Sequence, residues 1–118
     1  MTMPAKAAFV VYAQILVREG ELERFLTHIL NLAERSLADE TGCLQYDVIE
    51  LDRATQLFGV YEVYRDVAAY DEHQASVHFS AWKVVAEVVI EKGGLDVQTG
   101  RRVLQSSAEQ TRPSPPLG

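Results

Sequence analysis

The segment from residue 8 to residue 17 is apolar on both sides of a two-residue repeat, and no other feature constrains the fold as much. One side carries Phe9, Val11, Ala13, Ile15 and Val17, and the other carries Val10, Tyr12, Gln14 and Leu16. A strand with one wet face alternates apolar and polar residues instead. We therefore expect a strand whose first face is covered by the chain's own helices and whose second face packs on another sheet. In a chain of 118 residues, that sheet most simply belongs to a second copy, so a homodimer is predicted.

A long helix and a hairpin are expected next. Apolar residues recur at spacings of three and four from Glu21 to Asp39, which indicates an amphipathic helix. Thr41-Gly42 ends this helix. The alternating stretches 44–49 and 56–64 then predict two paired strands.

Two short helices and a last strand complete the domain. Residues 67–73 favour a helix, and Ser76 is well placed to cap another one. Gly93-Gly94 is expected to break the pattern before a fourth strand over residues 95–104. The order β-α-β-β-α-β is that of the ferredoxin-like α+β fold with an antiparallel sheet, which pairs into a dimeric α/β barrel.

The predicted domain spans residues 8–104, and the two ends of the chain are not expected to belong to it. Residues 1–7 are interpreted as an N-terminal extension. Residues 105–118 contain three prolines and few apolar groups, so they are expected to form a disordered tail.

Composition narrows the function. The chain has 11 basic and 17 acidic side chains and a net charge of −6, which disfavours nucleic acid and anionic membranes as partners. No apolar run reaches the roughly 18 to 20 residues of a membrane span. A single cysteine, Cys43, forms no internal disulfide and suits a cytoplasmic location. We expect Cys43 to behave as a small apolar residue, because no electropositive neighbour is evident that would activate its thiol.

The stretch from Val60 to Trp82 concentrates the residues that carry chemistry. Glu62 is expected near the end of a strand, His73 near the end of the next helix and His78 in the first turn of the helix after that. Where three element ends meet, a pocket with polar groups at its rim is expected.

The two histidines raise the question of a metal site. On one continuous helix, a separation of five residues turns the side chains about 140° apart. A shared metal therefore requires the helix to break between them, which Ser76 suggests. No third ligand has convincing spacing, since His28 lies on the outer flank of the long helix, so no metal is predicted. The alternative is that both histidines satisfy buried backbone groups.

Glu62 stands in an otherwise apolar strand, where an unpaired charge is unfavourable. It either pairs with Arg65, Arg101 or Arg102, or has a functional reason. His73 has an ordinary pKa that suits acid/base work near neutral pH, and we interpret His73 and Glu62 as the catalytic pair. Aromatic residues are core or interface residues by default, but several should line the pocket. The expected substrate-binding residues are Tyr12, Tyr46, Tyr64, His78 and Trp82.

Several pieces together resemble the antibiotic biosynthesis monooxygenase family, which consists of small dimeric ferredoxin-like proteins. The matching residues are Gly20 after the first strand, Glu40, Gly42 and Tyr46 in the turn into the second, Tyr61, Glu62, Tyr64 and Asp66 at a strand end, and His73, His78 and Phe79. The resemblance covers roughly residues 8–104 and is carried by the order and spacing of these pieces.

The resemblance implies a cofactor-independent monooxygenase that oxidises a phenolic or quinol-type small molecule with O₂. In this branch His73 would assist deprotonation, and Tyr46, Tyr64 and Trp82 would shape the pocket. A heme-degrading branch has asparagine, tryptophan and histidine where this chain has Ala13, His73 and Trp82, so heme cleavage is not expected.

Two alternatives remain open. An isomerase branch degrades a phosphorylated autoinducer-2 compound and has a similar tyrosine, glutamate and histidine pattern. There the same His and Glu would move protons, and phosphate would need nearby basic residues. The other alternative is a non-catalytic dimer that binds a small ligand. Turnover that depends on His73 would separate an enzyme from such a dimer.

Overall fold

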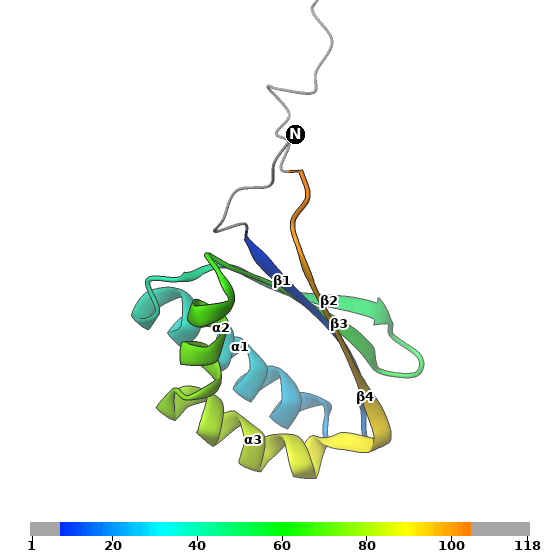
Figure 1. Ribbon diagram of the computed structural model, residues 1–118. Coiled ribbons are helices and arrows are strands. Elements are labelled where there is room, and N and C mark those ends of the chain that lie inside the picture. Colours follow the sequence, from blue (N-terminus) through cyan, green and yellow to red (C-terminus); the bar gives the residue numbers. More distant parts are fainter. Residues whose placement is uncertain (1–7, 105–118) are drawn as a thin grey trace, which may run out of the picture.

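Three helices cover one face of a four-stranded antiparallel sheet (Figure 1). The computed structural model describes residues 8–104. In chain order the elements are β1 (Phe9–Val17), α1 (Leu22–Asp39), β2 (Cys43–Asp52), β3 (Leu57–Tyr64), α2 (Val67–Gln74), α3 (Val77–Val89) and β4 (Ile90–Arg101). The strands lie in the order β2-β3-β1-β4, and every neighbouring pair is antiparallel. The predicted ferredoxin-like plan is confirmed.

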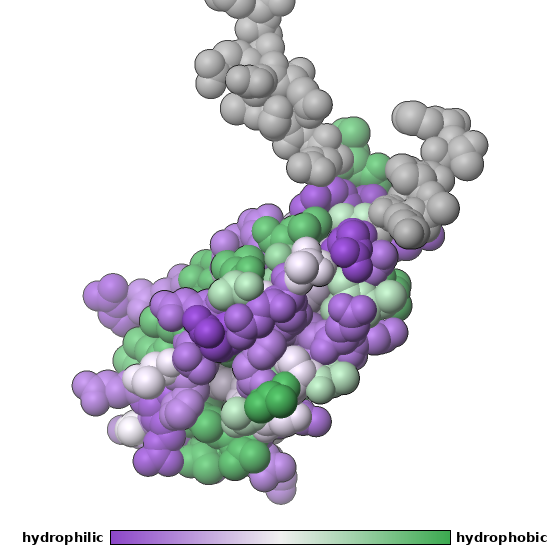
Figure 2. Space-filling model, turned by 90° about the vertical axis from the view of Figure 1, so that its left-hand side faces the viewer, coloured by the Kyte–Doolittle hydropathy of each residue, from purple (hydrophilic) through white to green (hydrophobic). Residues whose placement is uncertain are grey.

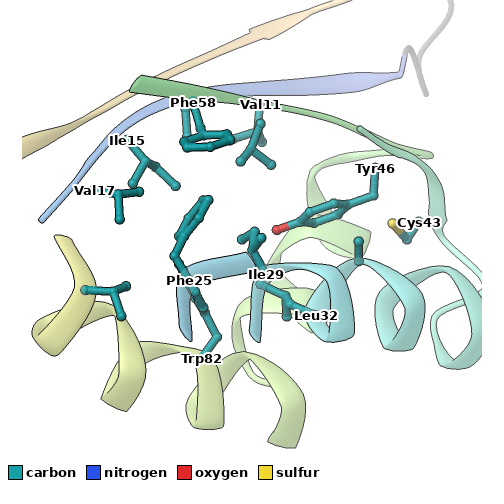
Figure 3. Close-up of a cluster of buried hydrophobic side chains, with 14 of the residues drawn as sticks. Val11, Ile15, Val17, Phe25, Ile29, Leu32, Cys43, Tyr46, Phe58 and Trp82 are labelled. Carbon is teal, nitrogen blue, oxygen red and sulfur yellow. The ribbon is translucent and has the colours of Figure 1, made fainter. Parts of the chain in front are cut away.

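The core lies between the sheet and the helices, and its residues follow the periodicity of each element. Val11, Ile15 and Val17 of β1 point toward the helices, as the two-residue repeat of a strand requires (Figure 3). Phe25 of α1 packs between the sheet and α3, with its ring centroid 5.0 Å from Phe58 and 6.0 Å from Trp82. Burying one such side chain stabilises the fold by roughly 1.5–3 kcal/mol.

The opposite face of the sheet has no element packed on it within residues 8–104 (Figure 1). Tyr12 of β1 and Tyr61 of β3 lie on this face and are half-buried, whereas Val63 of β3 is buried. On β2, Ile49 and Leu51 remain exposed. By contrast, the side of the molecule where α1 ends and α2 and α3 lie is mostly hydrophilic (Figure 2). Both faces of β1 are therefore apolar, but the helices of this chain cover only one of them.

Polar caps set the limits of the two short helices. The Asp66 carboxylate accepts a hydrogen bond from the Ala69 N–H at 2.9 Å, and the Ser76 hydroxyl accepts one from the Phe79 N–H at 3.1 Å. Each bond satisfies one of the amide groups that a helix start leaves unpaired. The prediction that Ser76 caps a new helix is confirmed, and His73 and His78 consequently lie on different helices.

The expected start of β4 is wrong. The strand begins at Ile90 and ends at Arg101, so Gly93 and Gly94 lie inside it. The pairing of β4 with β1 shifts register between Ile15 and Val17, and Gly93 has a φ of 74° there. A side chain on Gly94 would lie 2.8 Å from the Glu91 carbonyl oxygen. The glycines therefore permit a bulge in the strand, rather than a break before it.

The expected extension (residues 1–7) and tail (residues 105–118) lie outside the described residues. Within the described range, no helix is long and apolar enough to cross a membrane.

Gly42 permits the close contact between the end of α1 and α2, and this contact can be tested. A Cβ at position 42 would lie 2.4 Å from the Ala69 Cβ. We expect Gly42→Ala to lower the free energy of unfolding by about 1–3 kcal/mol through overpacking, measured by urea denaturation. In an Ala69→Gly background the same change should have a smaller effect, because the clash is gone.

Gly100→Ala is the matched control, since nothing lies within 4 Å of a Cβ placed there. Equal unfolding free energies for Gly42→Ala and Gly100→Ala would contradict the packing described here.

Candidate active site

A cavity of about 350 Å³ lies between the sheet and α3, and its walls are largely apolar. The sheet provides Val11, Ala13, Ile15, Tyr46, Val60, Glu62, Ile90, Leu95 and Val97, and the helices provide Ile29, Tyr70, Phe79, Trp82, Lys83, Ala86 and Glu87. Part of this wall is visible in Figure 3, where the Tyr46 hydroxyl points toward the centre of the cluster. A cavity of this size and character is typical of small-molecule sites.

Glu62 brings a carboxyl group to this apolar wall. On β3, Val60, Glu62 and Tyr64 all face the helices because alternate residues share one face. Glu62 is only 6% exposed, and its carboxylate accepts a hydrogen bond from the Tyr64 hydroxyl. Burial raises the pKa of Glu62 from 4.5 to about 7, against the opposing effect of that hydrogen bond; the nearby Glu40 adds to the rise. Glu62 can therefore take up or release a proton near neutral pH.

His73 lies directly behind Glu62. It occupies the last turn of α2, on the same buried face as Ala69 four residues earlier. His73 is 1% exposed, and its Nε2 atom is 3.8 Å from the Glu62 Oε1 atom. That distance is longer than a hydrogen bond. His73 is not part of the cavity wall, so it reaches the cavity through Glu62 and not directly.

Glu40 holds the other side of the His73 ring. It caps the C-terminus of α1, and its Oε2 atom is 2.9 Å from the His73 Nδ1 atom. Since a carboxylate can only accept, Nδ1 carries a proton and donates. Burial lowers the pKa of His73, and the hydrogen bond and charge of Glu40 oppose this effect. The Ser36 hydroxyl, one turn before Glu40, is also 3.4 Å from Nδ1.

His78 completes a continuous series of side chains. Its Nε2 atom hydrogen-bonds to the Oε2 atom of Glu40, the oxygen that also receives the His73 bond. The side chains of Glu40 and His78 are 10% and 14% exposed. The series therefore runs from Glu62 at the cavity, through His73 and Glu40, to the partly exposed His78.

Glu40 is the third potential metal ligand, which the spacing of the histidines in the sequence did not reveal. Among residues 8–104, Glu40, His73 and His78 are the one set whose geometry could hold a metal ion, with ligand atoms within 4.8 Å of one another. Two imidazoles and a carboxylate suit zinc or iron. The Glu40 carboxylate is hydrogen-bonded to both rings, and this bonding already accounts for their closeness.

The aromatic residues expected at the site are divided among three places. Tyr46 and Trp82 line the cavity. Burial raises the pKa of Tyr46, so its hydroxyl stays protonated and can donate a hydrogen bond. Tyr64 is fully buried behind Glu62. Tyr12 lies on the opposite face of the sheet, beside Gln14, away from the cavity.

Two other expectations concern the residues around the site. Burial and the charge of Glu40 raise the pKa of the Cys43 thiol to about 12, so Cys43 stays protonated and packs as a small apolar residue, as expected. The proposed pairing of Glu62 with an arginine is not found in the described part of the chain, where its partners are Tyr64 and His73.

Sequence reasoning missed several contributors to the site, among them Glu40 as the partner of both histidines, Tyr70 and Phe79. The Tyr70 ring stacks on His73 at 6.3 Å, and the Phe79 ring is 4.9 Å from it. Tyr70 precedes His73 by three residues on α2, a spacing that places both on one side of a helix. That signal could have identified Tyr70. Glu40 precedes His73 by 33 residues, and no local spacing connects them.

Comparisons with known proteins agree with this fold. Protein PA3566 of Pseudomonas aeruginosa is 26% identical with a TM-score of 0.75, and the match covers 86% of this chain and 100% of that one. Rv0793 of Mycobacterium tuberculosis is 21% identical with a TM-score of 0.77, covering 86% and 100%. SO0527 of Shewanella oneidensis is 23% identical with a TM-score of 0.73, covering 82% and 92%.

Among curated protein sequences, no significant match to the chain is found. The family model for antibiotic biosynthesis monooxygenases matches residues 8–85, which include β1, the cavity-lining part of β3 and both histidines. This chain therefore belongs to the antibiotic biosynthesis monooxygenase family.

Proposed function

We propose that this protein is a cofactor-independent monooxygenase that oxidises a phenolic or quinol-type small molecule with O₂. The observation that carries the proposal is Glu62, a carboxyl group with a pKa of about 7 in the wall of a largely apolar cavity lined by several aromatic rings. Such a wall favours a flat aromatic compound, and a base in that wall can remove its acidic proton. Membership of the family supports the same reaction class.

The chain's own groups would divide the work as follows. Glu62 removes a proton from the bound substrate. His73 lies on the side of Glu62 away from the cavity, with its Nε2 atom 3.8 Å from the Glu62 Oε1 atom. Tyr46 donates a hydrogen bond to the substrate oxygen as negative charge develops, and Trp82 holds the ring and excludes water. The substrate anion supplies the electrons for O₂. One oxygen atom enters the product as a carbonyl in place of two C–H bonds, and the other leaves as water.

An isomerase acting on a phosphorylated sugar-like compound has less support. Lys83 is the only basic residue that lines the cavity among residues 8–104, and its ammonium group lies 5.7 Å above the Phe79 ring. Arg65, Arg101 and Arg102 do not line it. A phosphate dianion would usually meet several charge-assisted hydrogen bonds in its site, so the cavity favours a neutral aromatic substrate.

We also propose that the protein is a homodimer formed through the uncovered face of the sheet. Tyr12 lies on this face, and its ring covers Gly59 of the neighbouring strand β3. A Cβ atom at position 59 would be 3.0 Å from the Tyr12 hydroxyl and 3.3 Å from the Leu51 side chain. A stable interface of the obligate kind buries on the order of 2,000 Å² or more. The free, buried thiol of Cys43 suits a reducing compartment, and we propose a cytoplasmic location.

The cofactor requirement gives the first test. With an anthrone or quinol substrate, O₂ uptake is expected to continue after exhaustive chelation and without added flavin or nicotinamide, because the substrate supplies the electrons. An oxygen electrode measures the rate. A requirement for metal or flavin would overturn the mechanism, and turnover of a phosphorylated keto-sugar without O₂ uptake would favour the isomerase.

The roles of the two buried acid/base groups give the second test. Glu62→Gln and His73→Gln should each lower kcat by roughly 10²-fold or more, the usual contribution of a general acid or base. Wild-type kcat should rise with pH through about 7 as Glu62 ionises. Glu34→Gln and His28→Gln change exposed residues of α1 and serve as matched controls. Full activity in the Glu62 and His73 variants, as in the controls, would refute these roles.

The oligomeric state gives the third test. Sedimentation equilibrium at micromolar concentration should report twice the mass of the chain, and Tyr12→Arg should shift the protein to monomer by burying a charge at the interface. Val84→Arg, on the exposed side of α3, is the control and should leave the dimer intact. A wild-type monomer at this concentration would contradict the proposal.

A further inference from the structure

We propose that Glu40 is the positioning residue of this site: it holds the Nδ1 side of His73, aims the Nε2 atom at Glu62, and lets His73 take over the proton that Glu62 removes from the substrate. This inference rests on the proposed function of the cavity. It assigns a part in the reaction to Glu40 and His78, although neither residue lines the cavity.

The hydrogen bonds on Nδ1 determine the tautomer of His73. Both carboxylate oxygens of Glu40 lie near this atom, at 2.9 Å and 3.2 Å. A carboxylate accepts only, so the proton of the neutral ring is on Nδ1 and the lone pair of Nε2 faces Glu62. At 3.8 Å, a movement of roughly 1 Å makes that contact a hydrogen bond, and such contacts often tighten when substrate binds.

Glu40 is also the counter-charge for a protonated His73. A buried imidazolium is unfavourable unless an opposite charge is hydrogen-bonded to it. The titratable groups that face His73 are Glu40 at the end of α1, Tyr46 of β2, Glu62 and Tyr64 of β3, Tyr70 of α2 and His78 of α3. Among the groups of residues 8–104, only Glu40 places a carboxylate in hydrogen-bond contact with the ring.

The proton is conserved through the cycle. An O–H or C–H bond of the substrate breaks and its proton goes to the Glu62 carboxylate. The new O–H bond of Glu62 then breaks as the proton moves to Nε2 of His73, while Nδ1 keeps its own proton and the ring becomes an imidazolium beside Glu40. After the substrate anion has formed a C–O bond to O₂, the proton returns by the same route to the outer peroxide oxygen. The second C–H bond at that carbon then breaks as the O–O bond breaks: its electron pair forms the carbonyl, and its proton joins the leaving hydroxide to complete the water.

His78 keeps Glu40 in place for this work. Its ring bonds to the Oε2 atom that also receives the His73 bond, so Glu40 is held from two sides. The chain between α2 and α3 turns at Ser76, whose hydroxyl donates to the His73 carbonyl oxygen at 2.6 Å. This turn is what brings both imidazoles to one carboxylate.

Glu40→Gln tests the proposal, because it removes the charge and keeps the shape. We expect kcat for O₂ uptake to fall roughly 10-fold or more, with KM changed less than about 2-fold because Glu40 does not line the cavity. Glu40→Asp should retain more activity than Glu40→Gln, and Glu34→Gln should match wild type. An unchanged kcat in Glu40→Gln, or a raised KM alone, would overturn the proposal.

Long-range ¹H–¹⁵N NMR of the imidazole rings supplies a readout that does not require turnover. Wild-type His73 should carry its proton on Nδ1, and the pKa of His73 should fall in Glu40→Gln as the carboxylate charge is lost. A wild-type ring protonated on Nε2, or an unchanged His73 titration, would refute the positioning role. If the wild type consumes no O₂, the proposed function fails while these measurements still decide the role of Glu40; if Glu40→Gln does not fold, the wild-type tautomer and Glu40→Asp decide it.

Discussion

The burial of one carboxyl group on β3 determines how the rest of the site is built. Because successive residues of a strand alternate between faces, placing Val60 and Tyr64 in the core places Glu62 there as well. An isolated carboxylate in such surroundings is strongly disfavoured, so it needs partners or takes up a proton. Glu62 does both: the Tyr64 hydroxyl donates to it, and its pKa rises to about 7.

The groups behind Glu62 depend on three helix ends that meet there: the C-termini of α1 and α2 and the N-terminus of α3. Gly42 lets the end of α1 approach α2 at Ala69, which brings Glu40 to the ring of His73. The cap at Ser76 starts α3 in a new direction, so that His78 reaches the same carboxylate. Helix packing and capping thus hold the side chains at the distances that proton transfer requires. The apolar cavity in front of Glu62 provides the space for a substrate.

Local patterns predicted the fold well, because they are properties of single elements. The spacing in α1, the alternation in β1 and the cap at Ser76 each depend on neighbouring residues. The start of β4 was missed because the glycines that usually end a strand here form a bulge within it. At the site, Glu62, Tyr46 and Trp82 are brought to the cavity, while Glu40 joins His73 across 33 residues. Only tertiary packing makes that contact, so no spacing rule could reveal it.

Glu62 lies in the cavity wall as a group that exchanges its proton near neutral pH. Titration of the side-chain carboxyl carbon by ¹³C NMR, in protein labelled at glutamate and assigned with Glu62→Gln, measures this directly. We expect a midpoint near 7, because burial disfavours the charged form. A midpoint near 4.5, the ordinary value for a glutamate, would show that the carboxylate is well solvated and that Glu62 does not exchange its proton near neutral pH.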